Sequence, residues 1–380
     1  MRRSSIREAA LVSILLLLGA HASGSSLLAA SPSAALLKVK QEAESQGYTF
    51  VTNHDEIVAG AKKEGKLRVL GSFDPSTYKA VTDAFRKHYP FIEVRVEEMT
   101  GTADPQRFFL ELKAGGAADW DVFNISPDFW TEGMPYTKKF DILGMAKHKV
   151  LAIPPPMVDP KYRTIVSIGS SIHAIGYNRK LISEEKVPNT WEDFLKPEFK
   201  GKKFLVDIRP QGFAALSAGL GEKWALDYAE KIAAQDPVWV RGQTGPLTAI
   251  VSGAHTMFHL AYYHSCMRAA KKDATGSLQC KVIEPVPARL QEFGSISHTA
   301  PHPYSSLLWL EFQATPEGQN TISNYEPFNT SIYSPESALA KVIRGKKVSM
   351  NDWGTLHNTD RFLQMVFKAF GLPKADDTKR

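Results

Sequence analysis

The sequence predicts a protein of the α/β class that is built from two domains. The first observation is the alternation of helix-like and strand-like segments between residues 55 and 125, which is typical of an open parallel sheet. The second is a long β-rich stretch, residues 164–177, which suits a strand that passes from one domain to the other. The third is length, since the roughly 350 residues that follow an N-terminal leader suffice for two domains of ordinary size.

The first half of the chain alternates regularly. The first predicted helix ends at Gly65, a residue type that commonly terminates helices. In the next one Ala80, Ala84 and Phe85 share one face, and Pro90 stops the pattern. In chain order we expect a helix at 55–65, a strand at 67–71, a helix at 76–89, a strand at 92–96, a helix at 106–114 and a strand at 120–125.

The rhythm changes after three consecutive prolines, residues 154–156, which form a rigid break. The strand at 164–177 comes next, and residues 281–287 are expected to form the return crossing between the domains. Between and after these crossings we expect a short helix at 191–195, a strand at 203–207, a long helix at 212–233, a helix at 246–253, a strand at 256–262, and helices at 303–313, 316–324 and 361–370.

The N-terminus has the features of an export signal. Three arginines within residues 2–7 precede an apolar run at residues 9–18, and Ala20-His21-Ala22 follows as a small-x-small cleavage pattern. The run is shorter than the ~20 residues that a membrane-spanning helix needs. We therefore expect residues 1–22 to be a signal peptide, with a second cleavage point near residue 30, and the mature protein to be soluble in the periplasm.

The two cysteines, Cys266 and Cys280, are expected to form a disulfide, because an exported protein reaches an oxidising compartment. Neither cysteine lies near the signal region, so a lipid anchor at the cleavage site is not expected. No Cys-x-x-Cys pair or neighbouring histidine pair completes a metal site around them.

Charge and motifs exclude several function classes. The formal net charge of +6 is spread along the chain and forms no basic stripe, so nucleic acid is not an expected partner. The sequence contains no Gly-x-Ser-x-Gly, no His-Glu-x-x-His and no Gly-rich phosphate loop before a helix, so no residue is nominated as a nucleophile and an enzyme is not expected. A periplasmic enzyme of unusual type and a sensory receptor stay open as the rival classes.

Three segments resemble one known family, the extracellular solute-binding proteins of the ferric-ion type that serve ABC transporters. The resemblance lies in residues 57–66 (IVAGAKKEGK) before the first strand, residues 187–201 (VPNTWEDFLKPEFKG) and residues 315–319 (TPEGQ). The segments occur in the family's order and span most of the chain. The resemblance implies a periplasmic receptor that hands a small ligand to a transporter permease and acts as a monomer.

The resemblance also implies the arrangement of the chain in space. Proteins of this family have two α/β lobes joined by crossing strands, with the ligand in a hinged cleft between them. Transferred to this sequence, lobe one comprises residues 50–170 and 290–340, and lobe two comprises residues 171–289 and 341–380.

Adjacent tyrosines, Tyr262 and Tyr263, stand where iron-binding members of the family hold Fe³⁺. Phenolate oxygen suits a hard, highly charged cation. The sequence departs from the family's pattern at two positions, because Asp74 follows the first strand in place of a histidine loop and Ser126 stands where a glutamate is usual. No cofactor is expected beyond bound Fe³⁺ with carbonate or phosphate, and a small organic anion without metal is the alternative ligand.

The turn between the strand at 203–207 and the following helix is the candidate anion site. Arg209, Gln211, Gly212 and Phe213 lie at a helix N-terminus, where backbone N–H groups and a fixed positive charge favour an anion. By resemblance this turn holds the carbonate or phosphate that accompanies iron, and the same geometry suits a carboxylate or phosphonate. Small polar residues at 169–171 and 242–244 offer further donors.

Overall fold

The computed structural model describes residues 32–99, 103–116, 119–125 and 130–372. The expected signal peptide and Ser126 therefore lie outside the described residues. From Pro32 onward the chain forms one compact unit, in which the described strands pair into a ten-stranded mixed sheet. Its main order is β2-β1-β3-β9-β4-β7-β5-β6, with β10 paired to β9 and β8 paired to β4.

The first half of the chain builds one end of this sheet from parallel strands. β1 (Lys66–Gly71) pairs with β2 (Glu93–Glu98) along its whole length and with β3 (Val122–Ile125) on its other edge. The helices between them are α2 (His54–Glu64), α3 (Pro75–His88) and α4 (Ala103–Lys113). Gly65 ends α2 in the left-handed conformation, with φ of 66°.

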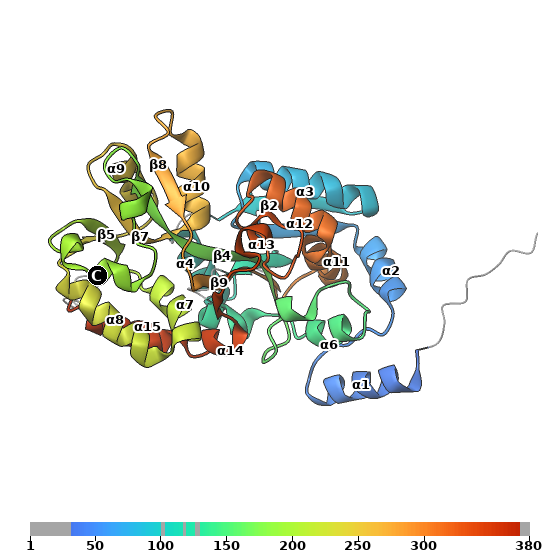
Figure 1. The fold of residues 1–380 in the computed structure, drawn as a ribbon. Helices are drawn as coiled ribbons and strands as arrows, with labels where there is room; N and C mark the ends of the chain where they lie inside the picture. The colour runs from blue at the N-terminus through green and yellow to red at the C-terminus, as the bar shows by residue number, and fades with distance from the viewer. Residues whose placement is uncertain (1–31, 100–102, 117–118, 126–129, 373–380) are drawn as a thin grey trace, which may run out of the picture. The chain divides into compact units, whose positions relative to one another are not determined.

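The other end of the sheet is built from residues 204–262. β5 (Phe204–Asp207) lies between β6 (Val238–Val240) and β7 (Met257–Tyr262), and all three are parallel. The helices that follow these strands are α7 (Gln211–Leu220) with α8 (Glu222–Ala234), then α9 (Thr244–Val251), and α10 (Tyr263–Lys272). Figure 1 shows this group in green to orange, on the opposite side of β4 and β9 from α2, α3 and α11.

Two long strands join the two ends. β4 (Ile165–Asn178) pairs through residues 165–172 with β9 (Val286–Ile296), and through residues 173–178 with β7 and with β8 (Leu278–Lys281). β9 in turn pairs with β3 and with β10 (Val348–Asn351). Both strands therefore pass from one half of the molecule to the other, as the β-rich stretch at 164–177 predicted (Figure 1).

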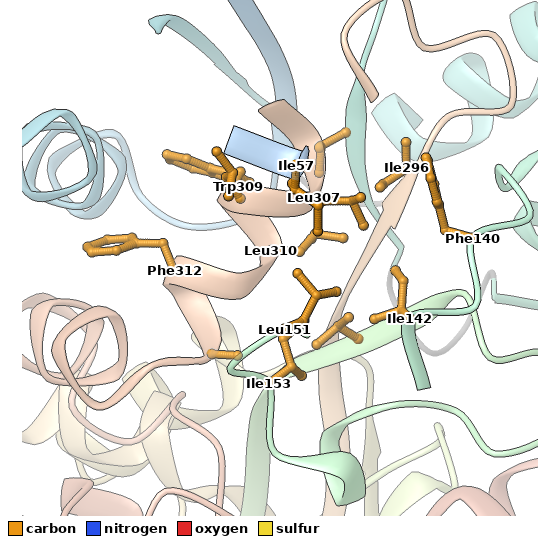
Figure 2. Packing of buried hydrophobic residues seen from close by; sticks show 14 of the residues in the cluster. Ile57, Phe140, Ile142, Leu151, Ile153, Ile296, Leu307, Trp309, Leu310 and Phe312 are labelled. Carbon is orange, nitrogen blue, oxygen red and sulfur yellow. The ribbon is translucent and has the colours of Figure 1, made fainter. Parts of the chain in front are cut away.

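The core is divided in the same way. One cluster gathers residues from 43 to 168 and from 296 to 322, and another gathers residues from 175 to 283 and from 362 to 370. In the first cluster α11 (Pro303–Ala314) is the central helix, with Leu307, Trp309 and Leu310 fully buried among Ile57, Ile142 and Leu151 (Figure 2). The α/β fold with two lobes is thus confirmed.

Seven further α-helices are described, and their buried residues lie in these two clusters or in smaller ones. They are α1 (Ala34–Ser45), α5 (Trp130–Gly133), α6 (Ile142–Lys147), α12 (Pro316–Tyr325), α13 (Ala338–Ile343), α14 (Trp353–Leu356) and α15 (Thr359–Ala369). Across the described part of the chain no helix combines the length and the apolar character needed to cross a bilayer.

Three sequence expectations need correction. The helix predicted at 212–233 is two helices, because Gly221 between α7 and α8 has φ of 91° and cannot continue an α-helix. Helix α10 was not predicted, and it follows β7 without a loop. The return crossing predicted at 281–287 is misplaced: Lys281 ends β8, residues 282–285 form no strand, and the crossing strand β9 spans Val286–Ile296.

The expected disulfide is confirmed. Cys266 in α10 is bonded to Cys280 in β8, and the bridge closes a loop with a sequence separation of 14. Tyr263 and Cys266 of α10 are buried, and the bridge adds a covalent link between this helix and the sheet.

Replacing both cysteines by Cys266→Ala and Cys280→Ala should lower the free energy of unfolding by about 3 kcal/mol, because a loop of this length then gains entropy in the unfolded chain. Urea unfolding of the oxidised protein and of the double variant measures the difference. Dithiothreitol should destabilise the wild-type protein similarly and leave the variant unchanged. Equal stability of the variant and the oxidised protein would contradict this account.

Candidate ligand-binding site

Three helices begin at one edge of the sheet in the second half of the chain. Strands β5, β6 and β7 are parallel, and α7, α9 and α10 start shortly after they end. Ligands of α/β proteins bind at this carboxyl edge, where helix N-termini present N–H groups. The polar residues at the strand ends are Asp207 and Arg209 after β5, Gln243 before α9 and Tyr262 at the end of β7.

A β-bulge in β7 orients Tyr262. The pairing of β7 with β4 shifts by one residue between Ala174 and Gly176, and Leu260 opposite has a left-handed φ of 52°. Met257 and Leu260 pack in the same cluster although they are three residues apart, which regular alternation does not allow. The extra residue therefore turns Tyr262 toward α7.

The Asp207 carboxylate is hydrogen-bonded to residues that follow the ends of these strands. It accepts hydrogen bonds from Arg209 Nη2 at 2.6 Å and from Gln243 Nε2 at 3.1 Å, and it is 8% exposed. Gln243 Oε1 in turn accepts a hydrogen bond from the backbone N–H of Tyr262 at 2.9 Å. One buried carboxylate thus fixes the positions of the Arg209 turn, the start of α9 and the end of β7.

A small cavity of about 10 Å³ lies inside this network, enough for about one water molecule. A Cβ atom at Gly212 would lie 3.1 Å from Leu260 Cβ and 3.2 Å from His173 Cδ2, so a larger residue here would require these neighbours to shift. The cavity is lined by His173, Val206, Asp207, Arg209, Gly212, Phe213, Gln243, His259, Leu260 and Tyr262.

Tyr262 lies between two neutral histidines. Its ring centroid is 4.8 Å from that of His173 and 5.6 Å from that of His264, with which it stacks. Burial, aided by the charge of Arg289, lowers the pKa of His173 to about 3. Burial, aided by Arg268, lowers the pKa of His264 to about 4. Both imidazoles are therefore uncharged at neutral pH.

The site has a positive charge next to the tyrosine hydroxyl. Arg289, on β9, donates from Nη1 to the Tyr262 hydroxyl at 3.4 Å, and the arginine is 4% exposed. Asp207 forms an ion pair with Arg209, and His173 and His264 are uncharged at neutral pH. The Arg289 guanidinium is a donor that can form charge-assisted hydrogen bonds beside the phenol.

Strand β9 contributes a second polar side chain, that of Glu292, at the edge of the first half of the molecule. Glu292 has a left-handed φ of 56°, accepts a hydrogen bond from Ser72, and is 3.4 Å from Asn329 Nδ2. Asn329 Nδ2 also donates to Glu326 at 3.2 Å, and Glu326 accepts from the backbone N–H of Asp74 at 2.9 Å. Burial, with repulsion from Glu326, raises the pKa of Glu292 to about 7.

The structure separates several residues that the sequence grouped. Tyr262 and the turn containing Arg209, Gln211, Gly212 and Phe213 meet around the small cavity, as described above. Tyr263 is 8% exposed and packs on Phe328, with a centroid distance of 4.9 Å, in a separate hydrophobic cluster. Asp74 has an exposed side chain beside a larger groove that it shares with His264, and Ser126 lies outside the described residues.

Asp207, Arg289 and Glu292 were not predicted as site residues from the sequence. Asp207 ends a predicted strand two residues before Arg209, a spacing that places a carboxylate within reach of the guanidinium. For Arg289 and Glu292 the sequence has no comparable signal, because their positions depend on the path of β9. Within the described ranges no cluster of three or more His, Cys, Asp or Glu side chains has the arrangement of a metal site.

Comparison with known proteins supports the class indicated by the sequence. Residues 121–291 match the family model of the bacterial extracellular solute-binding proteins, which confirms the resemblance found in the sequence. No curated protein sequence matches the chain.

Solved structures show the same fold at low identity. The iron-bound HitA from Pseudomonas aeruginosa is 15% identical, with a TM-score of 0.60 over 81% of this chain and 99% of that one. Trichodesmium IdiA (FutA), in complex with iron and citrate, is 17% identical, with a TM-score of 0.63 over 80% and 99%. MotA from A. tumefaciens B6, in complex with glucopine, is 17% identical, with a TM-score of 0.57 over 81% and 100%.

Glu292 should make the stability of the protein depend on pH. Its folded-state pKa of about 7 lies above its ordinary value, so the stability that Glu292 supports is complete below pH ~4.5 and is lost as the pH rises through 7. Between pH 5 and pH 8 the wild-type protein should therefore lose about 3 kcal/mol more than a Glu292→Gln variant. Urea unfolding of both proteins at the two pH values tests this, and a parallel response to pH would contradict it.

Proposed function

We propose that this bacterial extracellular solute-binding protein is the periplasmic receptor of an ABC uptake transporter, and that its ligand is a small organic anion. The observation behind the choice of ligand is the buried Arg289 guanidinium, 3.4 Å from the Tyr262 hydroxyl in a site where the histidines are neutral. A carboxylate or phosphonate forms charge-assisted hydrogen bonds with a guanidinium and accepts a hydrogen bond from a phenol hydroxyl.

The site offers a matching set of donors. The Tyr262 hydroxyl and the Arg289 guanidinium approach the ligand from β7 and β9, and the amides at the start of α7 approach it from a third direction. Pro210 is the N-cap of α7, and since proline has no side-chain acceptor, no capping side chain competes for these amides. The Asp207 network holds these donors in place before the ligand arrives, which reduces the entropy lost on binding.

The lobe boundaries expected from the sequence complete this proposal. With residues 50–170 and 290–340 as lobe one and residues 171–289 and 341–380 as lobe two, β4 and β9 contain the hinge. Arg289 then lies next to the boundary and Glu292 just beyond it. Closure of lobe one, through its loop at Ser72 and Asp74, would cover the ligand and create the surface that the permease recognises.

The class of solute-binding proteins also implies partners and a cellular location for this chain. Solute-binding proteins of ABC transporters work with permease components and bind small ligands, and they are not enzymes. We propose that residues 1–22 direct export to the periplasm, and that the mature protein is a soluble monomer. A sensory role would use the same cleft, and a permease gene beside this one favours transport over sensing.

Ferric iron with a synergistic anion is the second candidate. It is favoured by the chemistry of Tyr262 and His173, since phenolate and imidazole both bind iron, and by the Arg209 turn, which would hold carbonate or phosphate. Against it stands the Arg289 guanidinium, because a fixed positive charge within hydrogen-bond distance of the phenol opposes a cation there.

Two matched substitutions test the site. Tyr262→Phe should weaken binding of a small carboxylate by about 10-fold to 100-fold, because it removes one hydrogen bond to a charged group. Tyr263→Phe makes the same change in the next residue, whose ring packs in the core, and should leave affinity unchanged. Calorimetric titration with benzoate, citrate and phenylphosphonate measures both. Equal effects of the two substitutions would show that the site is misplaced.

Elemental analysis distinguishes the two ligands. Protein purified from its native periplasm without chelator should contain no stoichiometric iron and should show no red-purple tyrosinate band. Ferric loading with carbonate or phosphate should leave this result unchanged. One iron per chain, with the colour lost in Tyr262→Phe, would establish iron as the ligand in place of the organic anion.

A further inference from the structure

A groove of about 770 Å³ lies between α10 and the segment from Asn324 to Asn329. The two walls meet where Arg268 is 4.0 Å from Glu326, and Tyr263 of α10 packs on Phe328 of the segment. A volume of this size accommodates a small ligand. The full lining is Asp74, His264, Met267, Arg268, Ala270, Lys271, Lys272, Asn324, Tyr325, Glu326, Pro327, Phe328 and Asn329.

The wall that contains Asp74 and Asn329 offers unused hydrogen-bond acceptors. Asp74 is the N-cap residue of α3, but its exposed carboxylate accepts no capping hydrogen bond and forms no ion pair with a described residue. Asn329 is 6% exposed, and its Nδ2 donates to Glu292 at 3.4 Å and to Glu326 at 3.2 Å. These two bonds fix the orientation of the amide, and its buried Oδ1 has no partner among the described residues. This wall therefore suits a group that donates several hydrogen bonds.

Charge makes an ammonium the best match for this wall. Glu326 adds a second carboxylate beside Asn329, and it accepts a hydrogen bond from the backbone N–H of Asp74 at 2.9 Å. Tyr325 adds an aromatic ring that is 52% exposed. An ammonium donates three hydrogen bonds and is attracted both by carboxylates and by aromatic rings. A hydroxyl group would supply a donor without balancing the negative charge.

The α10 wall carries the opposite charge. Lys271 and Lys272 are exposed, and neither forms an ion pair with a described residue. Arg268 lies beyond hydrogen-bond distance of Glu326. This wall can therefore form charge-assisted hydrogen bonds with an acidic group of a ligand.

The two charged walls do not neutralise each other across the groove. Asp74 forms no ion pair with the cations of α10, so a ligand that contacts both walls must carry its two charges apart. Met267 of α10 and Phe328 of the opposite wall pack in one hydrophobic cluster and also line the groove. They provide apolar contact for a chain that connects the two charged groups of the ligand.

We infer that this groove is a second binding site, for a zwitterion whose ammonium and acidic groups are separated by an apolar chain. The ammonium binds the Asp74 carboxylate and Asn329 Oδ1. The chain lies on Met267 and Phe328, and the acidic group binds the two lysines of α10. The site is separate from the proposed anion site, because none of the residues that line the small cavity lines the groove.

Calorimetric titration with linear ω-amino acids, from γ-aminobutyrate to ω-aminooctanoate, tests the inference. Affinity should pass through a maximum along the series, because only one chain length places both charges at their partners. At that length the amino acid should bind about tenfold more tightly than the alkylamine or the fatty acid of equal carbon number, since each of these lacks one charge-assisted interaction. The titrations use the Tyr262→Phe variant as well as the wild-type protein, and affinity for the amino acid should be the same in both.

Substitution of Asp74 locates the ammonium. Asp74→Asn keeps the backbone N–H that donates to Glu326, and it should weaken binding of the best amino acid about tenfold while leaving the fatty acid unchanged. The matched control is Asp83→Asn, which removes an exposed carboxylate from the same helix outside the groove and should change neither affinity. Thermal unfolding of both variants checks that the fold is retained.

Substitution of the lysine pair locates the acidic group. The variant with Lys271→Gln and Lys272→Gln should bind the best amino acid about tenfold more weakly and the alkylamine with unchanged affinity. The matched control is Lys62→Gln with Lys63→Gln, which removes an adjacent lysine pair from the last turn of α2 and should change neither affinity.

Other outcomes overturn the inference without affecting the proposed anion site, which benzoate and phenylphosphonate test separately. If no ω-amino acid binds, or if chain length has no effect on affinity, the inference is wrong. If Tyr262→Phe weakens the amino acids and Asp74→Asn does not, they bind at the anion site and the inference is wrong. If the amino acids bind as expected and benzoate, citrate and phenylphosphonate do not bind, the inference stands and the anion site is wrong.

Discussion

The two lobes depend on one buried strand. All 14 residues of β4 are buried. The first half of the strand pairs with β9, and the second half pairs with β7 and β8. Because every main-chain group in so buried a strand needs a hydrogen-bond partner, β9 and β7 must lie where β4 places them. Arg289 lies within β9 opposite Ser171 of β4, and Tyr262 ends β7 opposite His173, so the geometry of the site follows from the pairing of β4.

Strands β7 and β9, which both pair with β4, depart from regular strand geometry at the site. Leu260 in β7 and Glu292 in β9 are non-glycine residues with left-handed φ, an arrangement that costs free energy and is frequent at functional positions. In β7 the irregularity turns Tyr262 toward α7. In β9, Leu290 and Phe293 pack in the same cluster although they are three residues apart, and Glu292 between them breaks the alternation. Each irregularity thus places a polar side chain that regular alternation would direct elsewhere.

The fold was predictable from the sequence wherever hydrophobic periodicity was strong. The strands and helices between residues 55 and 125 and the crossing strand at 164–177 were all expected within a few residues. Helix α10 was missed although Tyr263, Cys266, Met267 and Ala270 have the i, i+3, i+4, i+7 spacing of an amphipathic helix, because the two tyrosines were interpreted as the end of a strand. Tyr262 and Tyr263 were predicted to act as a pair. Because α10 begins between them, the ring of Tyr262 faces the cavity and the ring of Tyr263 packs in the core. Arg289 was missed because its role arises from pairing between strands that are distant in the sequence.

The placement of Arg289 and Glu292 in one strand has a thermodynamic consequence. Three residues of strand separate them by roughly 10 Å, within the distance over which charges in a protein interior interact. An anion bound at Arg289, as proposed, would bring negative charge toward a carboxyl group whose pKa is already about 7 and would favour the protonated form of Glu292. By reciprocity, protonation of Glu292 would favour that anion, so that capture of the proposed ligand would be linked to proton uptake.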